Sequence, residues 1–284
     1  MPNVQSLGFA ALRRLVFGAV ALGLAAAPAA HAAAVVPGFN SNTLPRNDDG
    51  STGLVSIGFD VNFYGENFSQ LYVNNNGNVT FDAALGTFTP FPLTDTARQI
   101  IAPFFADVDT RGSGSAEVTY GAGTFDGRQA FGVNWVDVGY FGSHFDKLNS
   151  FQLILVDRSD TGAGNFDIIF NYDQIQWETG DASQGSGGLG GFSARVGYSN
   201  GTGDPGTFFE LPGSAVNGAF LDSNLSTGLI YNSIGSDVDG RYIFNARNGT
   251  VIPTIPEPAS LVMSGMAALV GATIAWRRRR PADA

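Results

Sequence analysis

The stretch that decides the fold reads FQLILV at residues 151–156, TGAG at 161–164 and FDIIF at 166–170. In the last run Phe166, Ile168 and Phe170 share one face and Asp167 lies on the other, the alternation of a half-buried strand. The first run is apolar on both faces, which is typical of a strand in the middle of a sheet. A glycine-containing loop between two such runs predicts an antiparallel hairpin.

Similar hairpins lie upstream along the chain. LYV at 71–73 and NVTF at 78–81 flank NNNG at 74–77, and VTY at 118–120 and AFGV at 130–133 are joined around Asp126 and Gly127. Asparagine and glycine tolerate the positive φ that tight hairpin turns require. Further strand-like runs occur at 192–198, 207–211, 229–232 and 241–245, and no long stretch shows a 3.6-residue apolar period. The sequence therefore predicts an all-β fold, an antiparallel β-sandwich forming one domain from Phe39 to Asn248.

The N-terminal residues have the composition of a secretory signal peptide. Arg13 and Arg14 precede an apolar run from Leu15 to Leu24, and Ala30-His31-Ala32 supplies the small-x-small pattern of a cleavage site. The alternative, a permanent membrane helix, is disfavoured because a span needs about 20 apolar residues. We expect residues 1–32 to be a signal peptide that is cleaved after Ala32, with Ala30 and Ala32 as the recognised residues.

The C-terminal residues form a second export element of three parts. Pro256-Glu257-Pro258 comes first, residues 259–276 are apolar, and Arg277, Arg278, Arg279 and Arg280 follow. A helix over those 18 apolar residues would be roughly 27 Å long, close to the hydrocarbon thickness of a bilayer. Four arginines stay on the cytoplasmic side. The pattern predicts a single transmembrane helix over 259–276.

The order of these three parts resembles the PEP-CTERM sorting signal of Gram-negative bacteria, over residues 256–280. The resemblance implies recognition by an exosortase, cleavage near Pro256-Glu257-Pro258 and only transient contact with the membrane. It also implies a producer that makes exopolysaccharide and grows as biofilm or floc. The alternative is a simple tail anchor in which Pro-Glu-Pro occurs by chance.

Charge and composition exclude several classes of function. The chain has 15 basic and 25 acidic residues; removing both ends takes away six arginines and two acids, which leaves 9 and 23 and a net charge of −14. Such a surface repels nucleic acid, so no nucleic-acid partner is expected. There is no cysteine, and His144 is the only histidine outside the signal peptide. Thiolate zinc sites, thiol nucleophiles and multi-histidine metal sites are therefore excluded.

Several phrases in the central part resemble the nidogen-like extracellular domain, known as NIDO. They are IAPFFADVD at 101–109, FGVNWVDVGY at 131–140, NSFQLIL at 149–155, DIIFNY at 167–172 and IQW at 175–177. Together they place a nidogen-like core at about 97–200, with Phe105 where the family usually has tryptophan. The resemblance implies an extracellular, matrix-associated, adhesive role without catalytic residues.

Asp107 and Asp109 are the candidate metal ligands. They lie two residues apart in an expected strand, which would place both carboxylates on one face. With Asp137 or Asp146 from a neighbouring strand they could supply oxygens to calcium, which needs about 6–8. Calcium is the one candidate cofactor. The alternative is a solvated acidic edge, or aspartates that cap the turn at Arg111.

Two other groups of residues allow both a functional and a structural interpretation. Phe131, Trp135 and Trp177 could stack on sugar rings, but aromatic residues at alternate strand positions are more often core. Glu178 and Asp181 are the pair that a glycosidase would need, although nothing in the sequence fixes their separation. The pair Asp237 and Asp239 is a weaker copy of the Asp107 pattern and is interpreted as a turn.

The sequence thus favours a non-enzymatic protein, exported through the inner membrane to the cell surface or extracellular matrix. Its expected partners are an exosortase and exopolysaccharide or other matrix components, and its expected role is adhesion within biofilm or floc. The alternative is a calcium-dependent carbohydrate-binding module. A secreted hydrolase is disfavoured because no nucleophile–base pair or acid pair stands out.

Overall fold

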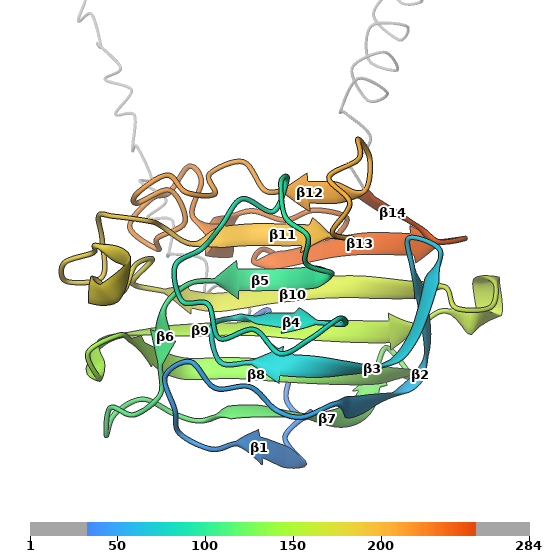
Figure 1. Cartoon of the computed structure of the whole chain (residues 1–284), viewed down its shortest axis with the longest axis horizontal. Coiled ribbons are helices and arrows are strands. Elements are labelled where there is room, and N and C mark those ends of the chain that lie inside the picture. The colour runs from blue at the N-terminus through green and yellow to red at the C-terminus, as the bar shows by residue number, and fades with distance from the viewer. Residues whose placement is uncertain (1–32, 254–284) are drawn as a thin grey trace, which may run out of the picture. The chain divides into compact units, whose positions relative to one another are not determined.

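The computed structural model describes residues 33–253, which form two antiparallel sheets packed face to face (Figure 1). The larger sheet has eight strands and the smaller has six. In sheet order the larger contains β1 (Asn42–Leu44), β7 (Val118–Phe125), β8 (Arg128–Tyr140), β9 (His144–Asp157), β10 (Phe166–Ile175), β13 (Arg241–Arg247) and β14 (Thr250–Pro253), and β6 (Val108–Asp109) pairs with β8. The predicted all-β, antiparallel architecture is confirmed.

The smaller sheet lies in front of the larger one in Figure 1. In sheet order it contains β12 (Phe208–Glu210), β11 (Arg195–Ser199), β5 (Ile100–Phe105), β4 (Asn78–Thr80), β3 (Glu66–Asn74) and β2 (Val55–Phe63). Three single-turn 3₁₀ helices, η1 (Ser159–Thr161), η2 (Asp181–Ser183) and η3 (Leu229–Tyr231), interrupt the loops.

The three predicted hairpins are all present. Leu153 of β9 pairs with Phe170 of β10, and both strands have a further neighbour, β8 and β13 respectively, so they are central as the apolar pattern of 151–156 indicates. The hairpin of β7 and β8 turns at Asp126 and Gly127, which both have positive φ.

Large aromatic side chains fill the space between the sheets. Trp135 stacks on Phe151 with ring centroids 5.3 Å apart, and Phe104 lies 5.2 Å from Phe151. Trp177 meets the Phe104 ring edge-on at 5.9 Å. Phe131, Trp135 and Trp177 are all buried. They are therefore core residues, and the sugar-stacking interpretation is wrong because no ring face is open to a ligand.

The N-terminal segment covers part of the outer face of the larger sheet. Phe39 is buried against Ile154, Val156 and Ile169, which belong to strands β9 and β10. Gln152 donates a hydrogen bond from its side-chain Nε2 to the carbonyl of Val36 at 2.9 Å. This cover explains why β9 is apolar on both faces.

Two expectations differ from the structure. The run at 229–232 contains η3 in place of a strand, and it packs beside β10. Asp107 lies in a corner between β5 and β6, outside either strand, because the chain passes there from the smaller sheet to the larger. Strand β14 continues the sheet to Pro253.

The two export elements lie outside the described residues. They include Ala30, Ala32, Pro256, Glu257, Pro258, the helix expected over 259–276 and Arg277 to Arg280. Within residues 33–253 no helix has the length and apolar character to span a membrane.

Candidate functional site: an acidic cluster at the β5–β6 corner

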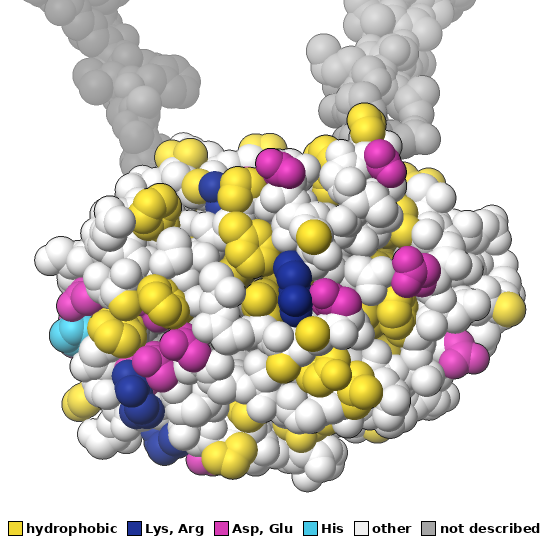
Figure 2. Space-filling view, viewed as in Figure 1, with side chains coloured by type: hydrophobic (Ala, Val, Ile, Leu, Met, Phe, Trp, Pro, Cys, Tyr) yellow, Lys and Arg dark blue, Asp and Glu magenta, His cyan; other side chains and the backbone are white. Residues whose placement is uncertain are grey.

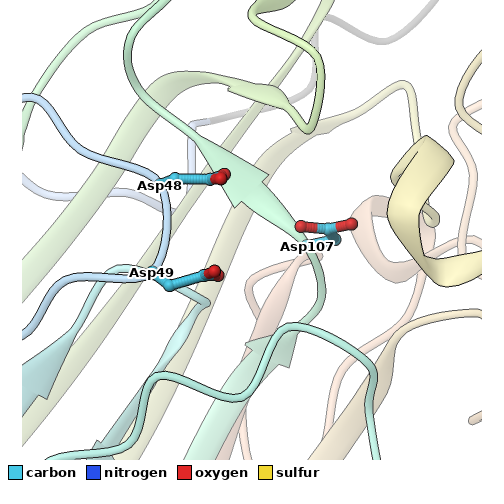
Figure 3. Close-up of side chains that lie close together, drawn as sticks. All are labelled: Asp48, Asp49 and Asp107. Carbon is cyan, nitrogen blue, oxygen red and sulfur yellow. The ribbon is translucent and has the colours of Figure 1, made fainter.

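Three carboxylates meet at one end of the domain. Asp107 comes from the corner between β5 and β6, and Asp48 and Asp49 come from the loop between β1 and β2. One carboxylate oxygen from each lies within 4.8 Å of the other two. In Figure 3 the side chains of Asp48 and Asp49 extend from their loop toward Asp107 on the opposite side. Figure 2 shows acidic side chains gathered beside basic ones at the end of this face where β6 lies.

Two buried asparagines of the β3–β4 hairpin hold the loop in place. Asn75 donates from Nδ2 to the carbonyls of Asp48 at 2.5 Å and Val108 at 2.6 Å. Asn76 donates from Nδ2 to Oδ1 of Asp49 at 2.9 Å, and its own Oδ1 accepts the N–H of Val108 at 2.9 Å. The same two side chains thus fix both segments that supply the carboxylates.

Asp107 is the buried member of the cluster, with 1% of its surface exposed. Its Oδ2 accepts a hydrogen bond from Ser183 at 3.4 Å, whereas its buried Oδ1 has no hydrogen-bond partner. Burial, followed by the charges of Asp48 and Asp49, raises the pKa of Asp107 to about 7. Burial also raises the pKa of Asp48 to about 6, helped by Asp109 and Asp49 and opposed by Arg111.

Asp109 has a different set of contacts from Asp107. Arg111 donates to its two oxygens at 2.9 and 2.7 Å, and the N–H of Ser143 donates at 2.8 Å. Burial alone would raise the pKa of Asp109, but the hydrogen bonds from Arg111 and Ser143 together lower it. Arg111 also lies 3.0 Å from Asp48. The carboxylate of Asp109 is therefore already neutralised by a cation of the chain.

The other aspartates considered with this pair lie elsewhere. Asp137 accepts a hydrogen bond from Ser150 at 3.2 Å, and Asp146 accepts one from Tyr140 at 2.9 Å. Neither belongs to the cluster. Asp48 and Asp49 are not among the metal ligands predicted from the sequence, although two consecutive aspartates in the NDDG segment were a visible signal.

Glu178 and Asp181 make unrelated contacts. Glu178 is fully buried and accepts the N–H groups of Gly218 and Phe220, each at 2.6 Å. Burial raises its pKa, against the opposing effect of those two hydrogen bonds. Asp181 pairs with His144 at 3.3 Å, where both side chains are more than 40% exposed. Glu178 therefore fastens the loop around residue 218 and does not form an acid pair with Asp181.

The structural role of Glu178 predicts how its substitution changes the stability of the domain. Glu178→Gln should lower the free energy of unfolding by about 1–3 kcal/mol, because the amide nitrogen cannot accept the backbone N–H that the carboxylate oxygen accepted. Asp181→Asn, at an exposed contact with His144, should change it by no more than about 0.5 kcal/mol. Urea unfolding followed by tryptophan fluorescence measures both. Equal effects of the two substitutions would contradict the structural role of Glu178.

Comparison with known proteins identifies the domain. Residues 69–248, well over half of the chain, match the family model of the nidogen-like domain. The chain belongs to the NIDO family. Residues 254–280 match the PEP-CTERM protein-sorting motif. The chain is thus exported to the cell surface or extracellular space, and neither matched family model is that of an enzyme.

Curated relatives of the NIDO domain include animal proteins. Human alpha-tectorin is 37% identical over 201 residues, covering 62% of this chain and 9% of its own length. Nidogen of Drosophila melanogaster is 29% identical over 211 residues, covering 66% of this chain and 15% of its own length. The chain therefore spans only a small part of these relatives. No solved structure matches the chain. Asp107 lies inside the NIDO match, whereas Asp48 and Asp49 precede it.

Proposed function

We propose that this NIDO protein is an adhesive or structural component of a bacterial extracellular matrix, delivered by an exosortase and held among exopolysaccharides. The observation that carries the proposal is the combination, in one chain, of a NIDO domain with a PEP-CTERM motif directly after it. The animal relatives that share the domain include nidogens, and sorting by the motif would bring the domain to the outside of the cell.

The chemistry of the domain supports binding in preference to catalysis. Glu178 is bonded to backbone N–H groups and Asp181 to His144, so this pair of carboxylates has no common site at which to act on a glycosidic bond. The surface carries a large excess of acidic residues. Such a surface attracts divalent cations, which can bridge it to acidic polysaccharides.

A calcium-dependent carbohydrate-binding module is the second candidate. The acidic cluster favours it, because Asp107 has a buried carboxylate oxygen without a partner. The burial of Trp135 and Trp177 speaks against it, since these aromatic rings cannot stack on a sugar.

Retention in the matrix tests the adhesive role. We expect the protein to sediment with exopolysaccharide prepared from the producing bacterium, and a strain that lacks the protein should settle more slowly and form weaker aggregates. Heat-unfolded protein is the control for non-specific trapping. A protein that stays in the supernatant, in a strain whose aggregates are unchanged by its loss, would contradict the proposal. Specific binding to isolated oligosaccharides on an array, abolished by chelator, would favour the second candidate instead.

A further inference from the structure

We propose that Asp48, Asp49 and Asp107 form a calcium site that fastens the loop preceding β2 to the β5–β6 corner of the NIDO domain. The site is independent of the adhesive role proposed above. It joins a segment outside the family match to a residue inside it.

Asp107 has a buried oxygen without a partner, and this oxygen favours a bound cation. Oδ1 of Asp107 is buried without a hydrogen bond, and so is Oδ1 of Asp48. In Figure 3 one oxygen of Asp107 faces Asp48 and Asp49, and the other faces the turn at η2, where Ser183 contacts Oδ2. The free oxygen is thus the one directed into the cluster. A buried carboxylate oxygen without a donor is costly unless a cation or a proton takes the donor's place.

The balance of charge around the cluster also favours a cation. Arg111 pairs with Asp48 and Asp109, but within residues 33–253 no basic side chain forms an ion pair with Asp49 or Asp107. Of these four carboxylates, only those of Asp48 and Asp109 are paired with the guanidinium of Arg111. The carboxylates repel one another at this spacing, and a divalent cation would relieve that repulsion.

The spacing and the chemical type of the ligands suit calcium. Calcium binds oxygens at about 2.3–2.6 Å, so two oxygens on the same ion lie no more than roughly 5 Å apart. The three carboxylate oxygens lie within 4.8 Å of one another. All three ligands are hard oxygens, which suit calcium better than zinc. Magnesium demands tighter octahedral geometry and loses its water reluctantly, so it should bind more weakly.

The surrounding structure holds the ligands in position. Asn75 and Asn76 hold the loop of Asp48 and Asp49, as described above. On the other side a Cβ added to Gly180 would collide with Oδ2 of Asp107, so the turn before η2 confines that carboxylate. Asp107 cannot swing away from the cluster in that direction. The ligands need little rearrangement to bind the ion.

The test compares two matched pairs of substitutions in the full-length protein, kept in mild detergent and freed of metal with a chelator. Asp48→Asn with Asp49→Asn removes two charges from the cluster. Asp237→Asn with Asp239→Asn removes two charges from an exposed turn elsewhere, where no metal cluster is formed. Calcium chloride is the probe, with magnesium chloride as the comparison. Titration calorimetry measures affinity, and differential scanning fluorimetry measures the melting temperature.

Calcium sites in extracellular modules typically have a Kd of roughly 0.1–1 mM. Because calcium would bind only the folded protein, about 10 mM calcium should raise the melting temperature of the wild type by roughly 3–10 °C. The Asp237/Asp239 variant should keep that rise, and the Asp48/Asp49 variant should lose it, with affinity at least about tenfold weaker. Hydrogen exchange of residues 47–50 should slow on calcium addition in the wild type only.

Equal loss in both double variants would overturn the site in favour of general screening of the acidic surface. An equal response to magnesium, or a calcium response that survives in the Asp48/Asp49 variant, would overturn it as well. If the Asp48/Asp49 variant does not fold by circular dichroism, Asp49→Asn alone decides the matter. That variant should lower calcium affinity at least about tenfold, and unchanged affinity would contradict the proposal. Failure of the matrix-retention experiment would leave these results unaffected.

Discussion

Replacing Gly77 by alanine is expected to destabilise the domain severely. Gly77 has φ +71° in the turn of the β3–β4 hairpin, and an added Cβ would overlap the carbonyl of Phe104 in β5. The colliding atoms are backbone, so rotation of a side chain cannot relieve the overlap. The ring of Phe151 would also lie only 3.3 Å from the new atom. We expect a loss above about 4 kcal/mol, which is a large part of the roughly 5–15 kcal/mol that stabilises a domain.

Gly127→Ala is the matched control for this prediction. Gly127 has nearly the same backbone angle, φ +74°, but no atom lies within 4 Å of the position of its added Cβ. It should cost only about 1–2 kcal/mol, the usual cost of a left-handed conformation. Urea unfolding measured by tryptophan fluorescence gives both values. Equal stability of the two variants would contradict the close packing of the hairpin turn against β5.

Disrupting the C-terminal motif should stop release of the protein almost completely. Glu257→Ala changes the sorting motif itself, and changing Arg277 to Arg280 into serine removes the charges that we expect to keep the end of the tail in the cytoplasm. Full-length protein should then accumulate in the inner membrane. Fractionation of the producing cells, followed by immunoblotting, measures the distribution.

A charge-matched control keeps this result interpretable. Changing Arg277 to Arg280 into lysine preserves the positive charge and should leave the protein anchored in the correct orientation during processing. Release of a shortened protein from both the alanine and the serine variants, at the wild-type level, would show that the tail is not a processing signal.

Local patterns in the sequence were sufficient to predict much of the fold. The hairpins at 71–81, 118–133 and 151–170 follow from alternating apolar residues and from turns rich in asparagine and glycine. Each of these hairpins lies within about 20 consecutive residues, so its turn residues and its alternating apolar residues are enough to predict it. The two export motifs are local in the same sense.

The candidate site could not be predicted in full because it depends on long-range packing. Asp48 and Asp107 are brought together by buried side chains of a third segment, Asn75 and Asn76, which the sequence marks only as turn residues. The pairing of Asp107 with Asp109 assumed a continuous strand, whereas the chain changes sheets between β5 and β6. Arg111 could then bind Asp109 and leave Asp107 without a cation.

The PEP-CTERM motif and the NIDO domain show that the protein is exported, and we propose that it is processed at both ends. Intact-mass spectrometry of the protein recovered from the extracellular fraction tests it most directly, because one mass depends on both termini. We predict a chain that begins just after Ala32 and ends near Pro256-Glu257-Pro258, without the four arginines. An extracellular protein that still carries Arg277 to Arg280, or a chain found only inside the cells with both ends intact, would contradict processing of the exported protein at both ends.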